Sequence, residues 1–245
     1  MSPGLAPEED AYGQAILDHL DGLETWEIVE RDDGHFSLGA GPKLYYSEYD
    51  QWREMERAAM ERVRGRVLDI GCGAGRFMLH LKDKGHDVVG FDNAPAAIEA
   101  CRRRGLDDVH VLAVEDLDGR FGTFDTVLLL GGNLGLLGNA EKGKDLLRRL
   151  YAITSPEGRL IGASRDRRET TDADMQDYVN RNLMLGRVSG QSRIRIRYRK
   201  YATPFFDFFR IAPEELEALL EGAGWRMNEV LHQDGESYVA VVDKL

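Results

Sequence analysis

The chain has 245 residues, which is enough for one α/β domain with a sizeable core and a modest addition. Its 32 basic and 43 acidic residues give a net charge of −11, which argues against general binding to DNA or to an anionic membrane. The N-terminus does not resemble a signal peptide, no apolar run approaches a membrane span, and the two cysteines lack metal-type spacing. We therefore expect a reduced, cytoplasmic protein without a metal site.

Residues 1–64 precede the predicted core and form an N-terminal cap. The pattern predicts a helix at 11–20 and a hairpin with strands at 26–30 and 35–38. An aromatic cluster follows, made of Tyr45, Tyr46, Tyr49 and Trp52.

The segment 67–77, VLDIGCGAGRF, is the most informative in the chain. An apolar run that includes Asp69 predicts a buried strand at 67–70, and the following apolar stretch predicts a helix at 76–84. Between them Gly71, Gly73 and Gly75 alternate with Cys72 and an alanine, which indicates a tight cofactor-binding turn.

A second strand, predicted at 87–91, ends in Asp92, 92 − 75 = 17 residues after Gly75. An acid at the carboxyl end of the next parallel strand is placed to hold the two hydroxyls of a ribose. The dinucleotide fingerprint would need a glycine where this chain has Arg76, and the Asp69 carboxylate would repel a pyrophosphate and favour a cation. The nucleoside cofactor that carries a cation and no phosphate is S-adenosylmethionine.

On these residues the chain resembles the class I S-adenosylmethionine-dependent methyltransferases, whose first motif has the same acid-x-G-x-G-x-G form. The resemblance covers about residues 63–162 and a C-terminal strand pair. It implies that an aromatic residue before the first core strand closes over the methionine end of the cofactor, and Tyr46 is the candidate. It also implies an acid and an apolar neighbour on the adenine, for which the candidates are Asp116 and Leu117, with Glu115 close by. Asn93 either contacts adenine or caps the next helix.

Further strands are predicted at 109–114, 124–130 and 159–164, with helices at 95–104 and 142–154. The predicted strand at 124–130 is followed by Gly131-Gly132-Asn133-Leu134. By the resemblance, this edge lies between methyl donor and acceptor, so Gly131 is a candidate cofactor contact. Asn133 either lines the acceptor pocket or is a turn residue.

Residues 165–210 are predicted to be an insertion that covers the substrate or forms a dimer contact, with a helix at 172–185. In the run 193–200 basic residues alternate with apolar ones. Arg195 and Arg197 either recognise a carboxylate or phosphate of the acceptor, or belong to a charged edge strand or the seam of a homodimer.

The chain ends in a predicted helix at 212–221 and two strands at 225–232 and 236–243, joined by Asp234-Gly235. Alternation of strand and helix predicts a doubly wound α/β fold: a mostly parallel seven-stranded Rossmann-like sheet with an antiparallel C-terminal hairpin. The core comprises 65–164 and 211–245.

The favoured interpretation is an S-adenosylmethionine-dependent enzyme that methylates oxygen, nitrogen or carbon of a small molecule by in-line displacement, releasing S-adenosylhomocysteine. No residue is assigned as catalytic, because a base is needed only for a hydroxyl or a protonated amine. The alternatives are an RNA or protein methyltransferase of the same fold, a non-catalytic S-adenosylmethionine sensor or partner subunit, and an NAD-dependent oxidoreductase.

Overall fold

The computed structural model describes residues 4–166, 170, 172–232 and 236–245. The chain divides into two compact units, each made of three segments. The first comprises Met1–Arg53, Arg64–Asp118 and Ile194–Phe205, and the second comprises Glu54–Val63, Gly119–Arg193 and Phe206–Leu245. The expected division into a cap, a core and an insertion stays a prediction.

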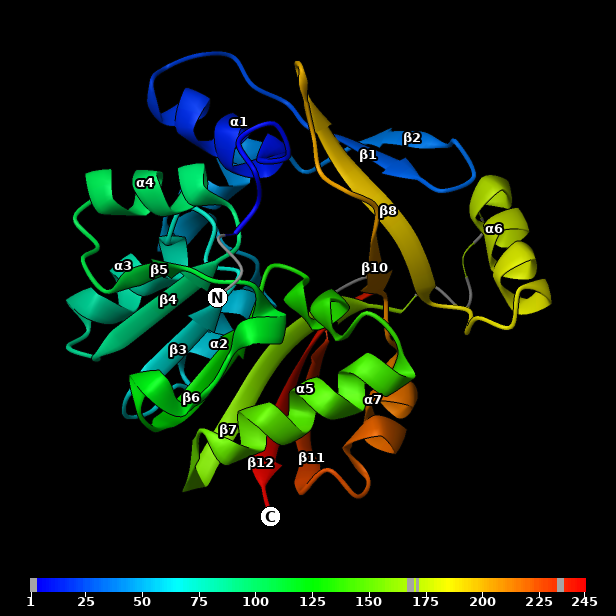
Figure 1. Ribbon diagram of the computed structural model, residues 1–245. Helices are drawn as coiled ribbons and strands as arrows, with labels where there is room; N and C mark the ends of the chain where they lie inside the picture. Colours follow the sequence, from blue (N-terminus) through cyan, green and yellow to red (C-terminus); the bar gives the residue numbers. More distant parts are fainter. Residues whose placement is uncertain (1–3, 167–169, 171, 233–235) are drawn as a thin grey trace. The chain divides into compact units, whose positions relative to one another are not determined.

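The first unit contains the helices and strands around the glycine motif (Figure 1). Its helices are α1 (Ala11–Leu20), α3 (Arg76–Asp83) and α4 (Pro95–Arg103), and its 3-10 turns are η1 (Pro42–Tyr46), η2 (Tyr49–Gln51) and η3 (Val114–Asp116). Its strands are β1 (Ile28–Arg31), β2 (Phe36–Leu38), β3 (Val67–Ile70), β4 (Val88–Asp92), β5 (Val109–Val111), β9 (Tyr201–Ala202) and most of β8 (Gln191–Tyr198). Of these, β3, β4 and β5 are parallel neighbours, so their carboxyl ends lie at one edge of the sheet.

Apolar side chains fix both helices of the glycine motif against these strands. β3 is buried along its whole length. Met78 of α3 packs with Ile98 and Cys101 of α4, with Leu106 and with Val109 of β5. This cluster holds the start of α3 in place relative to the strand that precedes it.

The N-terminal helix α1 lies against α4. Ile16 packs on the small side chain of Ala97, and a Cβ at Gly13 would come within 2.8 Å of the Ala97 nitrogen, so glycine permits the close approach. The buried Asp10 carboxylate accepts from the amides of Gly13 (3.0 Å) and Ala96 (2.7 Å). One side chain therefore caps both helices and joins residues 86 positions apart.

A smaller sheet is built from the predicted N-terminal hairpin and part of the insertion. β1 pairs antiparallel with β2 and also with β8, and β8 pairs with β9. The hairpin is thereby confirmed, although its first strand begins at Ile28 rather than at residue 26. Because β8 has neighbours on both sides, the expectation that the basic run is an edge strand is wrong.

The second unit completes the chain. Its helices are α2 (Glu54–Met60), α5 (Ala140–Ala152), α6 (Ala173–Met184) and α7 (Pro213–Leu220), and its 3-10 turns are η4 (Gly119–Phe121) and η5 (Asn133–Leu137). Its strands are β6 (Phe124–Leu129), β7 (Thr154–Arg165), β10 (Phe206–Phe209), β11 (Trp225–His232) and β12 (Ser237–Lys244). β6 and β7 are parallel, whereas β12 runs antiparallel to both β7 and β11.

The main sheet has seven strands in the order β11-β12-β7-β6-β3-β4-β5, which confirms the predicted Rossmann-like fold with its antiparallel C-terminal pair. Most boundaries differ from the prediction by one or two residues, and the largest differences are the end of β5 at Val111, because the chain enters η3, and the start of β7 at Thr154. The predicted turn Asp234-Gly235 lies outside the described residues. In the described part of the chain, no helix has the length and apolar character that crossing a membrane requires.

Candidate functional site

The glycine turn between β3 and α3 is held by backbone hydrogen bonds to the next strand. The amides of Gly71 and Cys72 both donate to the Phe91 carbonyl, at 2.7 and 3.0 Å. Gly75 has a φ of +73°, and a Cβ there would overlap the Leu106 side chain, so this glycine is needed for packing.

Gly73 differs from Gly75 in its surroundings. Its φ of +56° also favours glycine, but a Cβ there would meet nothing closer than Ile16 at 3.8 Å and Tyr45 at 3.9 Å. Packing of the protein alone therefore does not demand a bare backbone at Gly73. The open space above the Gly73 backbone would be filled by a side chain and is available to a ligand.

Asp92, at the end of β4, ties this turn to the next helix. Its buried carboxylate accepts from the Gly73 amide through Oδ2 and from the Ala94 amide through Oδ1, both at 3.0 Å. Burial raises the pKa of Asp92 to about 6, and these backbone bonds hold it below the value that burial alone would give. A carboxylate has about four lone-pair sites, and the Asn93 backbone also contributes a hydrogen bond, so about one site remains for a ligand hydroxyl.

Asp69 of β3 is a second buried acid beside the turn. Its Oδ2 is buried and has no hydrogen-bond partner among the described residues. Burial raises the pKa of Asp69 to about 7; the Arg76 guanidinium opposes this shift, and Asp92 adds to it. A buried carboxylate oxygen without a hydrogen bond is costly, and a cationic ligand group would relieve that cost.

Arg76 occupies the position that a dinucleotide fingerprint would give to glycine. The side chain is buried, donates to Ser47 Oγ at 3.1 Å and lies 4.1 Å from the centroid of the Phe77 ring. It therefore joins α3 to the aromatic segment before the first core strand.

The aromatic residue at the glycine turn is Tyr45. The Tyr46 hydroxyl donates to the Ile16 carbonyl at 2.8 Å, and its ring lies 4.8 Å from the Arg104 guanidinium. The role of Tyr46 at the cofactor stays a prediction, whereas Tyr45 contacts the space above Gly73 and was not singled out from the sequence. Tyr45 and Tyr46 are adjacent and identical in type, so the sequence alone does not show which of them lies at the glycine turn.

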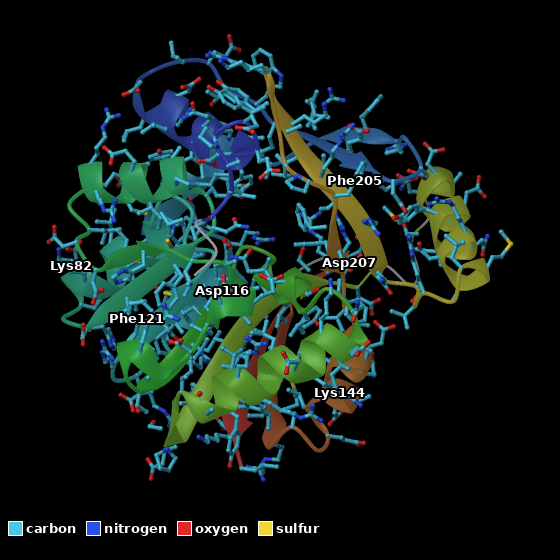
Figure 2. All side chains as sticks on the ribbon, viewed as in Figure 1. Lys82, Asp116, Phe121, Lys144, Phe205 and Asp207 are labelled. Atoms are coloured by element: carbon cyan, nitrogen blue, oxygen red, sulfur yellow. The ribbon has the colours of Figure 1, made fainter. Side chains whose placement is uncertain are left out.

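Residues after β4 and β5 occupy neighbouring loops. Asn93 is exposed, and the N-cap of α4 is Ala94 without a side-chain cap bond, so the capping alternative for Asn93 is wrong. The Leu112 amide donates to the Asp92 carbonyl at 2.9 Å, so the chain leaving β5 begins beside Asp92. It continues into η3 and the next residue, where Glu115 is exposed, Asp116 is half-buried (Figure 2) and Leu117 is buried.

Gly131 and Asn133 belong to the second unit and are described within it. Gly131 is exposed with a φ of +68° and open space where a Cβ would stand. Asn133 is half-buried at the start of η5, and its amide donates to the Leu130 carbonyl at 3.2 Å. Asn133 is thus a turn residue by its backbone; a role of its side chain in the acceptor pocket stays a prediction.

The two arginines singled out in the basic run share one acid. Arg195 forms two hydrogen bonds with Glu30 of β1 (2.8 and 2.9 Å), and Arg197 adds a third at 3.0 Å. The hydrogen bond from Arg195 is the largest influence that lowers the pKa of Glu30. Their charges are therefore partly neutralised across the β1–β8 pair, in which Glu30 and Arg195 are in register.

Comparisons with known proteins place this geometry among methyltransferases. Residues 67–158, which hold the glycine turn, Asp92 and the loop after β5, match the sequence model of a methyltransferase domain family. A solved S-adenosylmethionine-dependent methyltransferase from Bacteroides fragilis, in complex with S-adenosyl-L-homocysteine, superimposes with a TM-score of 0.84 at 25% identity. That match covers 98% of this chain and 97% of the other.

Two curated relatives extend the comparison. YqeM of Bacillus subtilis is 25% identical over 122 residues, which cover 48% of this chain and 49% of YqeM, so the match spans about half of that relative. The ubiquinone biosynthesis O-methyltransferase of Xanthomonas axonopodis pv. citri is 27% identical over 183 residues, covering 72% of this chain and 69% of the relative.

Proposed function

Because the chain belongs to the class I S-adenosylmethionine-dependent methyltransferases, with S-adenosylmethionine as its cofactor, we propose that it methylates a small-molecule acceptor at oxygen, nitrogen or carbon. The observation that carries this proposal is the pair of buried acids, Asp69 and Asp92, on either side of a bare glycine backbone.

The residues present fit this cofactor. The unpartnered Oδ2 of Asp69 suits a cationic group, and S-adenosylmethionine carries a sulfonium and an α-ammonium. The acceptor site that Asp92 retains suits a ribose hydroxyl, and the open surface of Gly73 allows close approach of a nucleoside. Asp116 and Leu117 are proposed for the amino group and the ring face of adenine.

The bound cofactor supplies an activated methyl group on a positively charged sulfur. The task of the protein is then to hold the acceptor atom, the methyl carbon and the sulfur in line, an alignment that contributes about 7–11 kcal/mol to lowering the barrier. Buried acids favour the cationic cofactor over its neutral product, so Asp69 also supports release of S-adenosylhomocysteine.

A small acceptor is favoured over RNA by the charges of the chain. The net charge is −11, and three arginines of the basic run that would support RNA binding are paired with acids. Arg195 and Arg197 bind Glu30, and Arg199 binds Asp18 at 2.8 Å. The Xanthomonas relative, an O-methyltransferase of ubiquinone biosynthesis, also agrees with a small acceptor.

The proposal is tested in two stages. Calorimetric titration with S-adenosylmethionine, S-adenosylhomocysteine and NAD should give micromolar binding for the first two and none for NAD. Tritium transfer from labelled S-adenosylmethionine is then measured to panels of phenols, amines and quinone precursors, with total RNA in parallel. Incorporation into RNA alone would contradict the small-molecule proposal, and binding of NAD alone would contradict the methyltransferase assignment.

A further inference from the structure

Two side chains of the α4 region hold carbonyl groups of the glycine turn. The Cys101 thiol donates to the Gly73 carbonyl, with Sγ and oxygen 3.1 Å apart, and the Arg104 guanidinium donates to the Ala74 carbonyl. These bonds join residues 28 and 30 positions apart. No backbone amide in the described part of the chain donates to either carbonyl, so α4 supplies the partners that the turn itself lacks.

The backbone on both sides of Gly73 is thereby fixed. The Gly73 amide donates to Asp92 Oδ2 at 3.0 Å, and the Gly73 carbonyl accepts from Cys101. Cys101 is buried in the apolar cluster that joins α3 to α4, so its thiol has a fixed position. Arg104 extends this support to the next peptide group, between Ala74 and Gly75.

Arg104 is held in turn by an aromatic ring. It is half-buried at the C-cap of α4, and its guanidinium lies 4.8 Å from the centroid of the Tyr46 ring, within the range of a cation–π interaction. The Tyr46 hydroxyl donates to the Ile16 carbonyl at 2.8 Å, which fixes the ring. Burial lowers the pKa of Arg104, and the proximity of Tyr46 opposes that shift.

The arginines at positions 102, 103 and 104 have different partners. Arg103 is exposed and pairs with Asp21 at 2.5 Å, and Arg102 is exposed and donates to the Val109 carbonyl at 3.3 Å. Among these three, Arg104 alone donates to the glycine turn. A surface ion pair such as that of Arg103 contributes little to stability, so Arg103 provides a neighbouring control of the same residue type.

We propose that Arg104 is a positioning residue for cofactor binding, because its guanidinium holds the Ala74 carbonyl and keeps the backbone after Gly73 in the conformation that receives the nucleoside. This rests on the proposed function. Without the guanidinium, the carbonyl of the buried Ala74 would lose its donor, and the peptide group would be free to rotate. A turn that is already ordered loses less conformational entropy when the ligand binds. The methyl donor and its product occupy the same turn, so Arg104 should strengthen the binding of both.

The test is calorimetric titration with S-adenosylhomocysteine and with methylthioadenosine, which keeps the nucleoside and lacks the amino-acid part. Arg104→Met keeps a long side chain and removes the donor, so we expect the Kd of both ligands to be at least tenfold weaker. Arg104→Lys should restore both affinities to within threefold of wild type, because a single nitrogen of Arg104 makes the bond and an ammonium can replace it. Arg103→Met should bind both ligands within twofold of wild type.

Each other outcome has a definite meaning. If folded Arg104→Met binds both ligands within twofold of wild type, or if Arg104→Lys binds as weakly as Arg104→Met, the inference fails. Weaker binding of S-adenosylhomocysteine alone would mean that Arg104 contacts the amino-acid part of the ligand directly, which refutes a positioning role. If wild type binds neither ligand, the proposed function fails first. Titrations are run well below the Tm of each variant, so that unfolding does not contribute to the loss of affinity.

Discussion

Replacing Asp92 by asparagine tests the ribose contact while preserving the shape of the side chain. The Asp92 carboxylate accepts backbone hydrogen bonds from Gly73, Ala94 and Asn93, which leaves about one lone pair for a ribose hydroxyl. In the variant an NH2 group replaces one oxygen and the charge is lost. With a charged hydrogen bond contributing about 1.5–3 kcal/mol, the loss of this contact corresponds to a Kd that is weaker by about 10- to 10²-fold.

The measurement is calorimetric titration of S-adenosylhomocysteine into wild type, Asp92→Asn and a control. Asp87→Asn is a suitable control, because Asp87 is exposed just before the same strand and pairs with Arg66 at the surface. The control should bind within twofold of wild type. If folded Asp92→Asn binds the ligand within threefold of wild type, the assignment of Asp92 to the ribose is refuted.

Three further changes test the glycine turn, the helix caps and the buried acids. Gly73→Ala should cost about 1–2 kcal/mol of stability because of its φ of +56°, and it should weaken the binding of S-adenosylhomocysteine more than tenfold because the methyl group fills the space above Gly73. Binding equal to that of wild type would contradict this. Gly85→Ala, at another positive φ in open space, is the control. Asp10→Ala removes the carboxylate that accepts from an amide in the first turn of α1 and from one in the first turn of α4. We therefore expect the free energy of unfolding to fall by about 2 kcal/mol and the Tm to fall by about 4–8 °C. An unchanged melting curve would show that Asp10 does not stabilise both helices. Because the pKa values of Asp69 and Asp92 without cofactor are raised to about 7 and about 6, ionisation of these acids opposes folding: their stabilising effect is present at low pH and is lost as the pH rises through these values. A cationic ligand favours the ionised acids, so the affinity for S-adenosylmethionine should rise from pH 5.5 to 7.5, and a flat calorimetric profile would contradict that linkage.

The sequence predicted the parts of the molecule whose causes are local. The glycine turn with the strand before it was predicted with the observed boundaries of β3, because apolar run, glycines and helix start are contiguous. α1 was likewise predicted at Ala11–Leu20. The end of β5 was not, because the apolar pattern continues to Val114 while the backbone turns into η3.

Partners that are distant in sequence escaped prediction. The two arginines of β8 were identified as a basic stripe, but their acid, Glu30, is 165 residues from Arg195 and is set by strand register. Glu27 gave no signal either, since one acid in a short strand-like run is typical of a solvated face. Its burial depends on loop 39–41 folding over it, which no periodicity encodes.

The electrostatics of the first unit argue for a cationic cofactor more strongly than the motif does. Asp69 and Asp92 are buried acids with raised pKa values in one corner, and Arg76 is the cation that opposes the shift of Asp69. Adding a pyrophosphate to such a corner would place further negative charge in a region of low dielectric, at a cost of several kcal/mol. Adding a sulfonium and an ammonium would instead neutralise charge that the fold has already buried. The same reasoning sets the direction of selectivity after transfer, because the product has lost one of those positive charges and should be held less tightly than the methyl donor.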